Sequence, residues 1–178
     1  MPRALRLQAP GAYYHVTSRG VDGIPIFIDN ADREVFLSIL ATVVKDYALE
    51  CHSYCLLSTH FHLVLGTPEA NLAAAMQRLN SGYAQSYNRR YGRKGHLFER
   101  RYHSEHLQTE AHLLETVRYV ALNPVRAGIC DRPDQWRWSS YRQLIGTARV
   151  EPWLIVSEVR AWLGAKTPNR VRAFVEAH

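Results

Sequence analysis

Cysteine is scarce in this sequence: Cys51, Cys55 and Cys130 are the three among 178 residues. An odd number without paired spacing argues against a disulfide framework and against a four-cysteine zinc site, so we interpret Cys51 and Cys55 as small buried residues. Long apolar runs are also missing, because no stretch approaches the roughly 20 residues that a membrane helix requires. The first six residues lack the apolar stretch of a signal peptide, so we expect a cytoplasmic protein.

Acidic residues are fewer than basic ones: the sequence has 16 Asp and Glu and 22 Lys and Arg, which gives a net charge of +6. Such an excess attracts polyanions, because neutralised phosphates release counterions. Only Glu99 opposes the cations of one short segment, which are Arg89, Arg90, Arg93, Lys94, Arg100 and Arg101. Aromatic residues that can stack on bases are interleaved with them, namely Tyr87, Tyr91, Phe98 and Tyr102. The segment is therefore either a surface for single-stranded nucleic acid or a solvated helix end followed by a strand.

An apolar share of 47% over 178 residues suits one compact domain with a short appended segment. Periodicity and turn residues predict the order strand, helix, strand, strand, helix, strand, helix, over 13–19, 29–47, 49–57, 60–65, 71–91, 97–107 and 109–123. The last of these helices should end at residue 123, because Pro124 disfavours helical geometry in the residue before it. We expect a turn and short helix over 136–144 and a short final helix over 157–163.

The first six elements match the split βαβ arrangement of the ferredoxin-like folds. The expected fold class is therefore α+β, with an antiparallel sheet, helices on one face, a third helix and a short C-terminal helical extension. We place the domain at 1–130 and the extension at 131–178, packed on the domain or continuous with it. The other face of the sheet remains for function or for a covering segment.

Two histidines, His60 and His62, alternate with Phe61 on a predicted strand. Side chains on a strand alternate between faces, so both imidazoles share one face, with Cα atoms about 6.5 to 7 Å apart. At that spacing the two rings can converge on one metal ion. The alternative is a pair of ordinary polar residues that point outward.

A second group lies on the predicted third helix, where Tyr119 and Asn123 are one turn apart, about 6 Å along the axis. His112 and Glu115 lie on the same side of this helix. A tyrosine on a polar stripe can face an active site. The alternative is that Tyr119 only packs and that Asn123 only ends the helix.

Together these groups resemble the HUH single-tyrosine transposases, IS200-like enzymes, and within them the REP-associated tyrosine transposases. The residues that carry the resemblance run through most of the chain: Tyr14-His15-Val16-Thr17-Ser18-Arg19-Gly20, His60-Phe61-His62, Gly95-His96-Leu97-Phe98-Glu99-Arg100-Arg101-Tyr102, Arg118-Tyr119-Val120-Ala121-Leu122-Asn123-Pro124-Val125-Arg126-Ala127-Gly128 and Trp138-Ser139-Ser140-Tyr141. Many members have Pro-Asn before the first histidine, where this chain has Ser58-Thr59.

The resemblance implies that His60, His62 and Asn123 ligate Mg²⁺ or Mn²⁺ and that Tyr119 is the nucleophile. It implies cleavage and rejoining of single-stranded DNA at hairpin-forming repeats through a 5′-phosphotyrosine intermediate. Glu115 and His112 are candidate proton acceptors on helical spacing alone.

The DNA-binding candidates are the six cations of 89–101 and, as an N-terminal arm, Arg3 and Arg6. The resemblance favours a monomer over a dimer that exchanges its tyrosine helix. Two other functions remain open: a non-catalytic protein that binds DNA hairpins, and a metal hydrolase that uses water and needs no tyrosine.

Overall fold

Four antiparallel strands form one sheet in the order β2-β3-β1-β4. In the computed structural model, which describes residues 8–164 and 167–177, these are β1 (Ala12–Arg19), β2 (Glu50–Leu56), β3 (His60–Thr67) and β4 (His103–Leu107). β1 pairs with both β3 and β4, and β3 also pairs with β2. This is the sheet of a split βαβ fold, so the predicted α+β class is confirmed.

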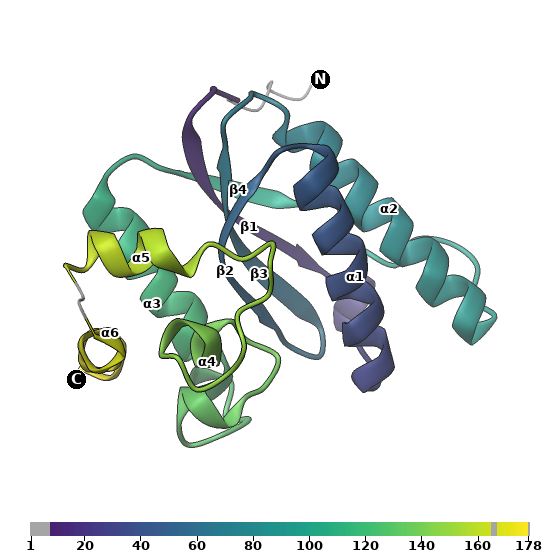
Figure 1. Ribbon diagram of the computed structural model, residues 1–178. Coiled ribbons are helices and arrows are strands. Elements are labelled where there is room, and N and C mark those ends of the chain that lie inside the picture. The colour runs from purple at the N-terminus through teal and green to yellow at the C-terminus, as the bar shows by residue number, and fades with distance from the viewer. Residues whose placement is uncertain (1–7, 165–166, 178) are drawn as a thin grey trace.

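The two faces of the sheet are covered by different helices (Figure 1). α1 (Asn30–Asp46) and α2 (Leu72–Tyr91) cover one face, where Phe36 of α1 packs on Phe61 of β3 with ring centroids 4.7 Å apart. α3 (Glu110–Arg126) lies across the other face. The remaining elements are short: η1 (Val21–Gly23), η2 (Pro133–Gln135), α4 (Tyr141–Leu144), α5 (Val156–Trp162) and α6 (Pro168–Glu176).

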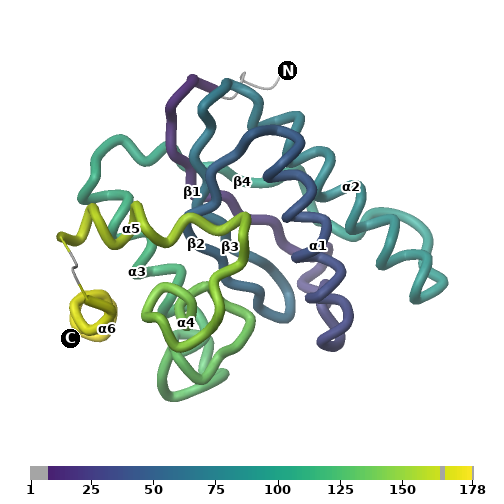
Figure 2. Tube along the Cα trace, viewed as in Figure 1, coloured from purple at the N-terminus to yellow at the C-terminus, as the bar shows by residue number. Residues whose placement is uncertain are grey.

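The chain after α3 covers the outer edge of β2, which would otherwise expose unpaired backbone groups. The amide of Leu56 donates to the carbonyl of Trp138 at 2.8 Å, and the amide of Ile155 donates to the carbonyl of Cys51 at 2.8 Å. In the Cα trace this green to yellow-green segment runs beside β2 (Figure 2). The segment that follows the predicted domain boundary is therefore bonded to the sheet.

Two predicted boundaries, and the prediction of which helix is the last, were wrong. The strand expected over 97–107 is confined to β4, because the chain at 97–102 leaves the sheet after one bridge between Gly20 and Phe98. α3 continues past residue 123 to Arg126, since Pro124 lies in the last turn, where its missing N–H costs one hydrogen bond. The helix expected over 157–163 corresponds to α5, but α6 follows it.

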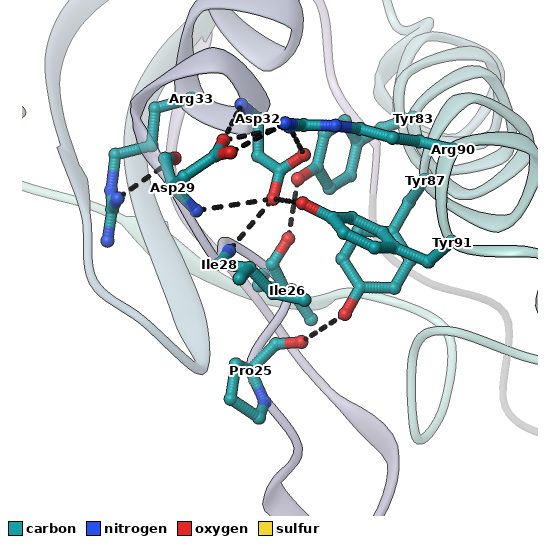
Figure 3. Close-up of polar contacts among 10 residues, drawn as sticks. All are labelled: Pro25, Ile26, Ile28, Asp29, Asp32, Arg33, Tyr83, Tyr87, Arg90 and Tyr91. Carbon is teal, nitrogen blue, oxygen red and sulfur yellow. Dashed lines mark hydrogen bonds and ion pairs between the residues drawn. The ribbon is translucent and has the colours of Figure 1, made fainter.

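A buried carboxylate joins the start of α1 to the end of α2 (Figure 3). Asp29 caps α1 in a capping box with Asp32. Arg90 lies 2.5 Å from Asp29 Oδ2 and 2.6 Å from Asp32 Oδ1, and the hydroxyl of Tyr91 donates to Asp32 Oδ2 at 2.9 Å. The amide of Ile28 donates to the same oxygen at 2.8 Å. Because Asp32 is only 3% exposed, water cannot solvate its carboxylate, which therefore depends on these hydrogen-bond donors from the protein.

Replacing Asp32 with alanine should therefore lower the free energy of unfolding by about 2 to 4 kcal/mol, because the Tyr91 hydroxyl and the Ile28 amide lose their acceptor and Arg90 keeps only Asp29. The matched control is Arg89→Ala, at an exposed neighbour of Arg90, which should change it by less than about 0.5 kcal/mol. Urea denaturation followed by circular dichroism measures both. Similar losses in the two variants would contradict the structural role of Asp32.

Candidate active site

The predicted histidine pair lies on the α3 face of the sheet. Phe61 points to the α1 face, so His60 and His62 on either side of it point the other way, with ring centroids 5.0 Å apart. His60 Nδ1 is 3.0 Å from the hydroxyl of Thr59. The alternation expected from the sequence thus brings both imidazoles together.

A third histidine, His15, belongs to the same group and was not singled out from the sequence. Its Nε2 lies 2.9 Å from Nδ1 of His62, and the two rings stack with centroids 5.2 Å apart. The antiparallel register explains this contact: Thr17 lies opposite His62, so His15 is the diagonal neighbour on the same face. The signal in the sequence was its place in the motif from Tyr14 to Gly20.

All three imidazoles favour the neutral state. Burial lowers the pKa of His62 to about 3, and it lowers the pKa of His15 to about 4 against the opposing effect of Glu105. The pKa of His60 is lowered by burial and then by the nearby charge of Arg19. In addition, Nε2 of His62 is buried and has no hydrogen-bond partner within the described ranges. A neutral, unpartnered imidazole nitrogen is the form that ligates a metal.

Tyr119 extends from α3 over these rings. Its ring centroid lies 5.7 Å from that of His62 and 5.8 Å from that of His15, in edge-on geometry. Tyr119 is 38% exposed, so it is not part of the hydrophobic core and is accessible to a substrate. The guanidinium of Arg126, two turns later on the same helix, lies 4.9 Å from the centroid of the tyrosine ring. The arrangement unites an accessible phenol, neutral imidazoles and a cation.

Asn123 is placed less directly. It is 7% exposed, and its side-chain amide donates to the carbonyl of Tyr119 at 3.3 Å. In the described part of the chain it has no hydrogen bond to His60 or His62. It lies one helical turn after Tyr119, as the sequence predicts.

The two candidate proton acceptors are already engaged. His112 Nε2 lies 3.4 Å from Glu105, and Glu115 lies 3.6 Å from Arg118. Across residues 8–164 and 167–177, neither has a hydrogen bond to Tyr119.

The six cations of 89–101 do not share one environment. Arg89, Lys94, Arg100 and Arg101 are exposed, although Arg100 pairs with Glu99 at 3.0 Å. Arg90 is bound by Asp29 and Asp32, and Arg93 lies over the ring of Tyr87. Arg3 and Arg6 lie outside the described residues. The charge of Arg90 is thus compensated within the protein, while that of the exposed members remains available.

Two of the interleaved aromatics are unavailable for stacking on bases, because Tyr87 and Tyr102 are buried. Phe98 is half-buried and lines a groove of about 670 Å³ between α2 and the chain at 95–102. Arg100 and Arg101 line the same groove.

The sequence of this chain matches a known family of proteins. A family model described as "Transposase IS200 like" matches residues 9–123. The chain belongs to the IS200-like transposase family. The match includes the histidine pair, Tyr119 and Asn123, and it confirms the resemblance found in the sequence.

Three solved structures are similar to this chain. A REP-associated tyrosine transposase bound to a REP hairpin is 15% identical, with a TM-score of 0.71 over 82% of this chain and 86% of that chain. A transposase candidate from Deinococcus radiodurans R1 is 17% identical, with a TM-score of 0.47 over 68% of this chain and 97% of that one. The tRNA(His) guanylyltransferase of Saccharomyces cerevisiae is 11% identical, with a TM-score of 0.51 over 98% and 80% of the two chains. A search of curated proteins gave no match.

One cluster of potential metal ligands was not anticipated from the sequence. Glu50, His52 and Glu158 each offer one ligand atom within 4.8 Å of the other two. Glu50 lies opposite Gly66, four residues beyond His62 on β3, so this cluster is about 13 Å along the strand from the histidine pair.

Among the described helices none is long and apolar enough to cross a membrane.

The buried histidines give a test that needs no substrate. Their pKa values of about 4 and 3 predict that His15 and His62 stay neutral at pH 5.5, where an ordinary histidine near 6.5 is mostly protonated. Between pH 6.5 and about 4 the unfolded chain binds these protons more readily than the folded protein, so stability is greatest above pH 6.5 and falls as the pH falls toward 4. Titration of the ring nitrogens by NMR, assigned with His15→Gln, measures the midpoints. Midpoints near 6.5 for both rings would contradict the burial seen here.

Proposed function

We propose that this transposase cleaves and rejoins single-stranded DNA at hairpin-forming repeats, using a divalent metal and a 5′-phosphotyrosine intermediate. The observation that carries the proposal is the contact of the Tyr119 ring with His62 and His15 on the α3 face of the sheet. A water-using metal hydrolase would not require a phenol over the histidines. The REP hairpin in the structure of the similar transposase supports a hairpin substrate.

The residues present fit a metal ion, because Nε2 of His62 is buried, has no hydrogen-bond partner among the residues that the structure describes, and belongs to a ring that is neutral at pH 7. His60, His62 and Asn123 would hold Mg²⁺ or Mn²⁺, which when bound supplies Lewis-acid polarisation of the scissile phosphate. Three neutral ligands leave the charge of the ion available to that phosphate.

His15 orients His62 for this role. If Nε2 of His62 is the ligand atom, the proton of that neutral ring is on Nδ1 and is donated to Nε2 of His15. The proton of His15 is then on its Nδ1, which lies 4.0 Å from a carboxylate oxygen of Glu105. This chain of contacts fixes one tautomer of each ring, so His15 is a positioning residue.

Tyr119 performs the covalent step. Its hydroxyl oxygen attacks the phosphorus, the P–Oη bond forms, and the bond to the 3′ oxygen breaks, which leaves a phosphotyrosine and a 3′ oxygen that takes a proton from water to become a 3′-hydroxyl. The phenol proton must pass to a base, for which Glu115 and His112 are the candidates. Glu115 is 61% exposed and needs only to leave Arg118, whereas His112 must leave Glu105. Attack by a 3′-hydroxyl on the phosphotyrosine reverses the step and rejoins DNA.

Substrate binding would rest on the exposed cations. Arg89, Lys94, Arg100 and Arg101 are positioned to contact phosphates, and the groove beside Phe98 can receive an unpaired base. Arg126 lies beside the phenol, where a cation can bind the phosphate under attack. We also propose that the protein acts as a monomer, because Tyr119 and the histidines of one chain already meet.

Replacing Tyr119 with phenylalanine removes the attacking oxygen but keeps the ring that contacts the histidines. We expect hairpin binding within about twofold of the wild type and a fall in cleavage of at least about 1,000-fold, with no covalent adduct. The measurement uses labelled single-stranded hairpin with Mg²⁺ or Mn²⁺ on denaturing gels. Tyr47→Phe, at the C-cap of α1, is the matched control and should keep adduct formation. Cutting by the Tyr119 variant would refute the nucleophile, and binding without cutting by the wild type would favour a non-catalytic hairpin-binding protein.

Replacing His62 with alanine tests the metal ligand. We expect metal-dependent cleavage to fall at least about 100-fold, while hairpin affinity changes by less than about threefold, because the proposed phosphate contacts lie elsewhere. His106→Ala, on β4, provides a histidine control. An equal loss of cleavage and binding in the His62 variant, with unfolding measured alongside, would indicate a structural role only.

A further inference from the structure

A second set of ligand atoms lies where α5 meets β2, in Glu50, His52 and Glu158. Nε2 of His52 is 3.8 Å from Oε2 of Glu50, and Nδ1 of His52 is 3.8 Å from Oε2 of Glu158. His52 is the extra residue of a β-bulge, because Cys51 pairs with Leu65 and Ser53 pairs with the next residue, Val64. Bulges redirect side chains and are common beside functional sites.

His52 is the unusual member of the group, since it is fully buried (0% exposed) and neither ring nitrogen has a hydrogen-bond partner within the described ranges. Burial lowers its pKa to about 4, although the backbone of Ile155 acts in the opposite direction. Its ring packs between Trp162 and Tyr13, at centroid distances of 5.0 and 5.4 Å. Unpartnered buried polar groups are rare, and a neutral imidazole among carboxylates is a metal-ligating group.

The carboxylate of Glu50 occupies space that depends on a glycine. A Cβ at Gly66, its partner across the β2–β3 pairing, would lie 2.6 Å from Oε2 of Glu50. The pKa of Glu50 is raised by burial and by the charge of Glu158. Among the described residues neither carboxylate pairs with a lysine or arginine. Two adjacent carboxylates without a cation are stabilised by a divalent ion.

We propose that Glu50, His52 and Glu158 bind a divalent transition metal of the Zn²⁺ class and so fasten α5 to the sheet. One nitrogen of His52 would ligate the ion, and one ligand atom of each of the three residues lies within 4.8 Å of the other two. Ligands about 2.0 to 2.1 Å from a tetrahedral Zn²⁺ lie about 3.3 Å apart, so rotations of the two glutamate side chains would close the site. One imidazole and two carboxylates leave a fourth position for water. This site is independent of the proposed strand-transfer chemistry, because it shares no residue with it.

The experiment separates this site from the His60–His62 pair. The full chain carrying both His60→Ala and His62→Ala is stripped of metal and unfolded thermally with and without Zn²⁺. We expect a midpoint about 5 to 10 °C higher at a Zn²⁺ concentration about 100 times Kd. Adding Glu158→Gln should abolish the rise. Glu151→Gln, at an exposed residue shortly before α5, should leave it unchanged.

Co²⁺ gives a second readout on the same proteins, because tetrahedral coordination produces visible absorption bands that should vanish with Glu158→Gln. Glu158 is 42% exposed, so this variant should fold even if His52→Gln does not. The absence of a Zn²⁺ effect in the His60→Ala, His62→Ala protein, or the same effect with Glu158→Gln, would overturn the site. Loss of DNA cleavage in His62→Ala alone would leave it standing.

Discussion

The hydrogen bond between His15 and His62 is the contact on which the candidate active site depends. It joins β1 to β3, the two central strands, through two rings that burial keeps neutral, and within the described ranges Nε2 of His62 has no hydrogen-bond partner. The antiparallel register holds this contact in place, since a slip of one residue between β1 and β3 would put the two side chains on opposite faces of the sheet. The pairing of two strands thus determines the chemical state of an imidazole.

α3 both packs on the sheet and presents Tyr119 to the solvent. One stripe of the helix is buried on the sheet, through Leu113, Val117 and Val120, while Tyr119 at the margin of that stripe stays 38% exposed above the histidines. The buried stripe fixes the rotation of the helix and therefore the position of the phenol. A side chain at a margin of this kind is held by packing yet remains open to a large substrate.

The order of the elements and the common face of His60 and His62 could be predicted because both follow from local periodicity. The placement of Tyr119 and Asn123 one helical turn apart could be predicted for the same reason, whereas the roles proposed for them come from the resemblance to the family. His15 could not be found that way, because its role arises from the β1–β3 register. The engagement of Arg90 and the cluster around His52 depend on contacts between α1 and α2 and on a bulge, which a single sequence does not reveal.

The C-terminal extension also holds α3, because Arg118 donates to the backbone of Val175 at 3.3 Å and to that of Ala177. Helix, sheet and extension of one polypeptide are therefore locked together, and trading the helix between two copies would break these bonds. In the proposed monomer, each molecule has one phenol beside its own histidines. Under the proposed mechanism a polypeptide that has captured a DNA end cannot cut again until that end is released, so two cuts in one substrate require two rounds or two molecules.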